Sequence, residues 1–201
     1  MDPADIDPQS RCRLPLPQRE ALDDAGRQIY DRLADPRGGS LRGLRGPGGI
    51  TLHSPELARL TRPLNQYLRY GSGLSGRVRE LAILVTAREC DSQFEWAAHE
   101  EEARREGLPD QTIEIVRHRG DLAGIAEPDA AVIAFGREIF GARAVSAETF
   151  ARCLALFGNR QLVDLVALMG NYASTAALLA AFEMRLDPGV EPPLPPPGRS
   201  G

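Results

Sequence analysis

Acid and base side chains gather around the second of the chain's three histidines. Glu95 precedes His99 by four residues and Glu102 follows it by three, so a helix would present all three on one face. A carboxylate within reach of an imidazole fixes its tautomer and favours its charged form, which suits a general acid working near neutral pH. The alternative is a solvated helix face, because charged residues fill the run from Glu100 to Glu106.

A further carboxylate, Glu80, falls near the start of the most apolar segment of the chain. The helix expected over 75–90 is apolar around most of its circumference, so it should be central and Glu80 should point inward or into a cleft. A buried carboxylate needs a partner. Arg77 on the same face is the structural candidate. His99 is the functional one, because Glu80 and His99 meet if 75–90 and 93–106 form an antiparallel hairpin.

The other two histidines are weaker candidates. His118 lies between Arg117 and Arg119 on a polar helix end, where we expect it to be solvated. His53 precedes a helix cap and follows a Gly-rich loop over 36–49 that could close over a pocket, so it is kept as a binding candidate.

Apolar periodicity and cap residues predict an all-α protein of about seven to eight helices. Ser92 and Glu95 have the spacing of a capping box at the start of one of them. We expect an N-terminal arm over 1–16, a single helical domain over 17–186 and a disordered Pro-rich tail over 187–201. The expected helices cover 17–33, 54–70, 75–90, 94–106, 110–119, 128–140, 147–157 and 160–185.

Composition limits the kinds of chemistry and partner. The 201 residues carry 24 basic and 28 acidic side chains, a net charge of −4, which gives no field for binding nucleic acid. All basic residues are Arg, which excludes a Schiff-base Lys and a Walker-type P-loop. Cys12, Cys90 and Cys153 form neither CxxC nor a disulfide framework, so we expect a cytoplasmic protein. We see no leader sequence and no charge-free stretch of membrane-spanning length.

Three runs together resemble the carboxymuconolactone decarboxylase family, which also contains the alkylhydroperoxidase D-like proteins. They are His53–Ala58, Ser75–Leu84 and Phe94–His99, with Ala103 and Gly107-Leu108 beyond. The resemblance covers about 45–185. It implies a single orthogonal helical bundle that assembles as trimers, hexamers or dimers.

The resemblance to the peroxidase branch fails at its thiols. That branch uses a glutamate, a CxxC pair and a histidine. Glu80 and His99 match its glutamate and histidine, but Ser92 and Glu95 stand where its cysteines belong. Dithiol chemistry requires sulfur, so we expect no peroxidase activity.

The decarboxylase branch also has a glutamate four residues before a histidine. The resemblance implies decarboxylation or enolate protonation of a small carboxylated lactone or cyclic acid, without a cofactor. His99 would be the proton donor or base, Glu95 its orienting partner or a second acid, and Glu80 a relay. For substrate binding we expect contributions from four residues, of which the arginines suit a carboxylate: Arg77, Arg88, Trp96 and His53.

Two alternatives remain open from the sequence. Glu80, Glu95 and His99 could form a ligand set for Fe, Mn or Zn, although metal-binding bundles usually supply more ligands. The chain could also be a non-catalytic, oligomeric ligand-binding protein that kept the scaffold after losing the thiols.

Overall fold

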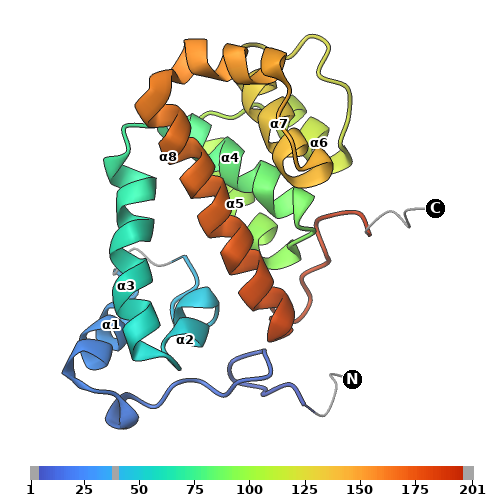
Figure 1. Ribbon diagram of the computed structural model, residues 1–201. Helices are drawn as coiled ribbons and strands as arrows, with labels where there is room; N and C mark the ends of the chain where they lie inside the picture. Colours follow the sequence, from blue (N-terminus) through green and yellow to red (C-terminus); the bar gives the residue numbers. More distant parts are fainter. Residues whose placement is uncertain (1–4, 38–40, 197–201) are drawn as a thin grey trace. The chain divides into compact units, whose positions relative to one another are not determined.

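A computed structural model of the chain describes residues 5–37 and 41–196. In that part of the chain there are eight α-helices and no strand, which confirms the all-α prediction (Figure 1). The helices are α1 Asp24–Ala34, α2 Pro47–Thr51, α3 Pro55–Gln66, α4 Gly76–Glu89, α5 Gln93–Arg105, α6 Asp110–His118, α7 Asp129–Arg137 and α8 Ala147–Ala181. Three short helical turns accompany them, η1 Arg19–Ala21, η2 Tyr67–Gly71 and η3 Glu138–Ala142.

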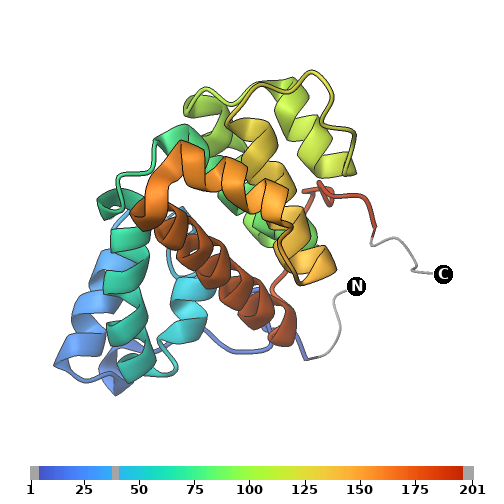
Figure 2. The ribbon, with the colours of Figure 1, turned by 45° about the horizontal axis from the view of Figure 1, so that its top comes forward.

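Most helices begin and end near the predicted residues, with two clear differences. The short helix α2 lies partly within the Gly-rich segment expected to be a loop, and a proline occupies its first turn. The two helices predicted over 147–157 and 160–185 are assigned as one, α8, with a kink at Gly158. The kink follows from the backbone of Gly158, whose φ of 65° favours glycine. The bend is visible in the orange part of α8 in Figures 1 and 2.

The chain divides into two compact units, which we describe separately. The first contains residues 1–66 and 177–190, and the second contains 67–176 and 191–201. These limits do not coincide with the boundaries expected at 16/17 and 186/187. The first unit has a small core of Leu22, Leu33, Leu52 and Ala58. Its N-terminal segment is anchored, because the Arg13 N–H donates to the Phe182 carbonyl over 2.8 Å.

Helix α4 is the central element of the second unit. Ser75 caps its start by accepting a hydrogen bond from the Val78 amide, and every residue from Val78 to Arg88 is buried. Helices α5, α6 and α7 pack against it. A Cβ at Gly136 of α7 would lie only 2.4 Å from Val85, so glycine is what allows α7 to approach α4 this closely.

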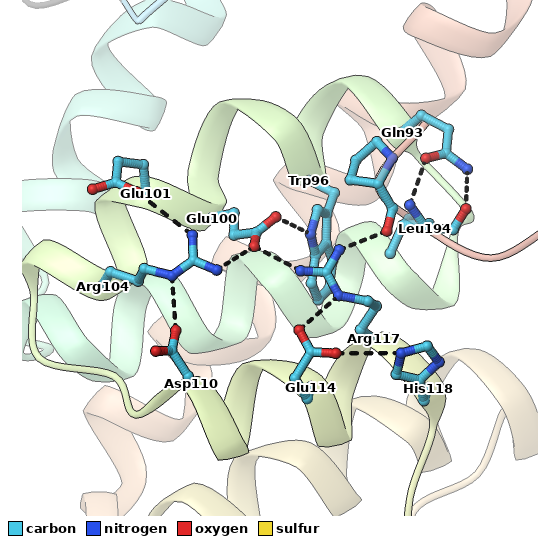
Figure 3. Close-up of polar contacts among 11 residues, drawn as sticks. Gln93, Trp96, Glu100, Glu101, Arg104, Asp110, Glu114, Arg117, His118 and Leu194 are labelled. Atoms are coloured by element: carbon cyan, nitrogen blue, oxygen red, sulfur yellow. Dashed lines mark hydrogen bonds and ion pairs between the residues drawn. The ribbon is translucent and has the colours of Figure 1, made fainter. Parts of the chain in front are cut away.

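The C-terminal segment of the second unit packs against α5 and α6. Leu194 is buried in the same core as α4. The Gln93 side chain bonds both backbone groups of Leu194, at 2.8 and 3.0 Å, and Arg117 donates to the Pro193 carbonyl over 2.6 Å (Figure 3). The prediction of a disordered tail is wrong for these residues, because proline-rich composition concealed one apolar anchor. The rest of that prediction, 197–201, lies outside the described residues.

Helix α8 differs from the expectation that no charge-free stretch has membrane-spanning length. By length and composition alone it could cross a membrane, as could the core helix of a water-soluble protein. One side of it is buried, through Leu162, Leu165, Leu168 and Met169. Its buried Asp164 accepts a hydrogen bond from the Tyr67 hydroxyl at 3.0 Å. We describe α8 in the second unit as a core helix.

Candidate functional site

Helices α4 and α5 form the antiparallel hairpin that the sequence predicts. The start of α4 meets the end of α5, where Arg79 donates to Glu106 over 2.9 Å. Deeper in the hairpin, Nδ1 of His99 lies 2.7 Å from Oε2 of Glu80. Glu80 is fully buried and His99 is only 4% exposed. The predicted meeting of these two side chains is therefore confirmed, and the imidazole is held inside the protein.

Glu80 stays ionised in this interior because cations surround it. Burial raises the pKa of the Glu80 carboxyl, but the hydrogen bonds from His99 and Arg79 and the charge of Arg69 together hold it below its ordinary value. Arg79 donates its Nε–H to Oε1 over 2.9 Å, and the Arg69 guanidinium lies 3.8 Å from the same oxygen. A Glu80 carboxylate so fixed accepts the Nδ1–H of His99 and leaves Nε2 for chemistry.

Glu95 lies on the other side of the same imidazole. Its Oε2 is 3.7 Å from Nε2 of His99, and both side chains are about 5% exposed. The capping box expected for Ser92 and Glu95 does not form. The Ser92 side chain makes no cap bond, and its amide donates instead to the Ala87 carbonyl. The Glu95 carboxylate is consequently beside His99, and the ring is flanked by a carboxylate at each nitrogen.

Tyr172 of α8 completes the surroundings of His99. The two rings meet edge to face, with centroids 5.2 Å apart and planes at 86°. Burial raises the pKa of the Tyr172 hydroxyl, which therefore remains protonated. The sequence analysis did not count Tyr172 among the site residues, although it is the aromatic residue among the small polar residues in the middle of a long apolar helix. That local contrast was the available signal.

Neither arginine predicted to bind substrate is at this site. Arg77 makes two hydrogen bonds to Asp129, at 3.2 and 2.5 Å, and a third to the Gly107 carbonyl. Arg77 is also not the partner of Glu80. The pairing expected from their shared helix face is therefore wrong. Arg88 is buried and pairs with Asp91. Both guanidiniums pair with an aspartate, whereas Arg69 and Arg79, which the sequence analysis did not single out, face Glu80.

The contacts of Trp96 and His53 do not support their predicted role in binding a substrate at His99. Trp96 is completely buried, donates its indole N–H to Glu100 over 2.8 Å and lies under the Arg117 guanidinium (Figure 3). It is a core residue whose polar and cation–π contacts are with Glu100 and Arg117. His53 belongs to the first unit, where its Nε2 lies 2.9 Å from the Pro15 carbonyl.

The three cysteines are separate free thiols. Burial raises the pKa of Cys90, and it raises that of Cys153 to about 11. Among the described residues, no group of three His, Cys, Asp or Glu side chains is arranged to hold a metal ion. The Glu80 carboxylate has cationic or N–H partners already, in Arg79, His99 and Arg69.

A comparison with models of protein families matches residues 55–135 to the carboxymuconolactone decarboxylase family. The matched segment runs from the start of α3 into α7 and includes Arg69, Arg79, Glu80, Glu95 and His99. No curated protein and no solved structure matches the chain.

Proposed function

We propose, from the match of residues 55–135 to the carboxymuconolactone decarboxylase family, that His99 carries out acid/base chemistry without a cofactor. The proposed reaction is decarboxylation of a small carboxylated lactone or cyclic acid, or protonation of a related enolate. The observation that supports it best is the buried imidazole of His99 with Glu80 at 2.7 Å on Nδ1 and Glu95 at 3.7 Å on Nε2.

The arrangement assigns a role to each group in this reaction. The bond between the substrate carbon and its carboxylate breaks, CO2 leaves, and the electron pair remains on the carbon as an enolate. Nε2–H of His99 then protonates that carbon, and water restores the proton. Glu80 holds the ring in the tautomer that exposes Nε2, and Glu95 stabilises the imidazolium before transfer. The low exposure of all three side chains keeps competing water away.

The same residues argue against the two other classes of chemistry considered for this site. Glu95 and Ser92 provide oxygen where a dithiol peroxidase needs sulfur, and the thiols of Cys90 and Cys153 are held protonated by burial. A metal ion would compete with Arg69 and Arg79 for Glu80. A non-catalytic role would not explain why an ionised carboxylate is buried against a histidine ring.

The test compares two histidines that each follow a glutamate by four residues. His99→Gln should abolish CO2 release from carboxymuconolactone. His118→Gln, whose parent residue pairs with Glu114 at 3.3 Å on the surface, should leave the rate unchanged. Circular dichroism and sedimentation check that both variants keep the fold and assembly. Undiminished CO2 release by the folded His99→Gln protein would overturn the proposal.

The self-association implied by the resemblance remains a prediction. Measuring the mass of the protein in solution would test it.

A further inference from the structure

Arg69 differs from Arg77, Arg79 and Arg88 because its guanidinium donates no hydrogen bond to the described residues. Its side chain is 12% exposed, and its Nε–H is buried with no acceptor among the described residues. Its closest ion-pair contact is Glu80 at 3.8 Å, which is beyond hydrogen-bond distance. A buried guanidinium donor without an acceptor is costly in a folded protein, unless a ligand supplies the acceptor.

Neighbouring Arg79 shows what a fully engaged guanidinium looks like. It donates to Glu80, to Glu106 and to the Arg69 carbonyl, at 2.9, 2.9 and 3.1 Å. Glu80 is thus oriented by Arg79 and His99 together. Arg69 is not needed to hold that carboxylate, and its fork of N–H donors remains for another anion.

Arg69 is close to both buried and exposed side chains. Arg69 lies in the π-helical turn η2, and its guanidinium packs over the ring of Tyr70, 5.0 Å from the centroid. Tyr70 is 56% exposed, whereas Glu80, which is also close to Arg69, is fully buried. The charge of Arg69 also reaches the buried Tyr172, whose pKa it lowers against the effect of burial. Arg69 is therefore near both Glu80 and Tyr172, and a small part of its own side chain reaches solvent.

We propose that Arg69 binds a carboxylate of the substrate and determines the preference of the site for dianionic molecules. The proposal rests on the proposed function, since it places a carboxylated substrate beside His99. It replaces Arg77 and Arg88 in that role, because Arg77 pairs with Asp129 and Arg88, whose Nε–H also lacks an acceptor, pairs with Asp91. The ligand class is a small dicarboxylate, which Arg69 contacts through paired N–H donors.

Calorimetric titration with two stable dicarboxylates, succinate and cis,cis-muconate, tests this inference directly. We expect wild-type protein to bind at least one of them and to bind uncharged succinamide much more weakly. Arg69→Gln should weaken dicarboxylate binding by about tenfold to a hundredfold, the effect of losing a charge-assisted hydrogen bond. Arg69→Lys should fall between, because it keeps the charge and loses the fork.

The control is Arg62→Gln, which removes a half-buried arginine of α3 that lies outside the site. It should bind as the wild type does. Thermal unfolding verifies that each variant is folded, and Arg69→Lys keeps the test usable if Arg69→Gln is not. A merely structural Arg69 would change the affinities for dicarboxylate and succinamide alike.

Three results would overturn the inference: no dicarboxylate binding by the wild type, wild-type affinity in both Arg69 variants, or equal binding of succinamide. Neither dicarboxylate probe is the substrate of the decarboxylation assay, so these outcomes are independent of turnover. Dicarboxylate binding through Arg69 in a protein that releases no CO2 would contradict the proposed function alone.

Discussion

His99 and His118 occupy the same local pattern, each four residues after a glutamate on a helix, but in very different surroundings. The His118 ring lies 3.3 Å from Glu114, with both side chains more than half exposed. The His99 ring lies 3.7 Å from Glu95, with both about 5% exposed, and only His99 has a second carboxylate at 2.7 Å. The closer of the two local pairs is the one on the surface.

The difference shows that the packing of α4 against α5, and not the local Glu–His pair, creates the candidate site. An exposed pair of this spacing stabilises a helix by about 0.5 kcal/mol or less, since water competes for both charges. Burial by α4 removes that competition and brings Glu80 to the free nitrogen of His99. Around His118 the charges instead join a surface network with Arg117, which also holds the C-terminal segment (Figure 3).

The largest expected effect is that of replacing the Glu80 carboxylate by an amide. The same change at Glu114 is the control. Glu80→Gln should lower the decarboxylation rate by about a hundredfold or more, because the amide no longer fixes the tautomer of His99. Glu114→Gln should not change it. Steady-state rates over a range of pH make the measurement. Equal rates in the two variants would remove the distinction between the regions.

Acid should weaken the His99 region through Glu80. The pKa of Glu80 is below its ordinary value of 4.5, so the stability that its ionised form contributes is complete above that pH and is lost as the pH falls through the lowered value. Wild type should therefore lose its advantage over Glu80→Gln as the pH falls below 4.5 and through the lowered pKa of Glu80. Urea unfolding at several pH values gives the difference, and a constant difference would contradict this account.

The network near His118 should matter for docking of the C-terminal segment, with a smaller effect. Gln93→Ala removes both side-chain hydrogen bonds to Leu194 and should lower the free energy of unfolding by about 1 kcal/mol. It should also increase proteolysis after the end of α8 while the decarboxylation rate stays the same. Unchanged protease sensitivity would show that Leu194 holds the segment without Gln93.

The smallest expected effect is that of the exposed pair itself. Glu114→Ala should change the free energy of unfolding by about 0.5 kcal/mol or less, because both partners are solvated. The change should shrink further in 0.5 M salt, where screening is stronger. Thermal melts at low and high salt provide the comparison. A larger, salt-independent loss would mean that Glu114 supports Arg117 more than it pairs with His118.

The helices and the central position of α4 could be predicted from the sequence, since apolar spacing and caps are local signals. The contact of Glu80 with His99 was also accessible, because a hairpin fixes which residues meet. Arg69 gave no such signal, and Tyr172 gave only its contrast with the apolar helix around it, because both reach the site from elements distant along the chain. Arg77 was misassigned because nothing local reveals its partner Asp129, 52 residues later. Leu194 was hidden because a single apolar residue among prolines has no periodicity.

Trp96 gives this protein a built-in optical reporter. It is the only tryptophan in the chain, and it is completely enclosed on the same helix as His99. Its emission should therefore follow the second unit alone, and Arg117 and Glu100 beside the indole make the spectrum sensitive to small movements of α5. Ligand entry near His99 can be watched without attaching a dye, in a chain that has no lysine to label.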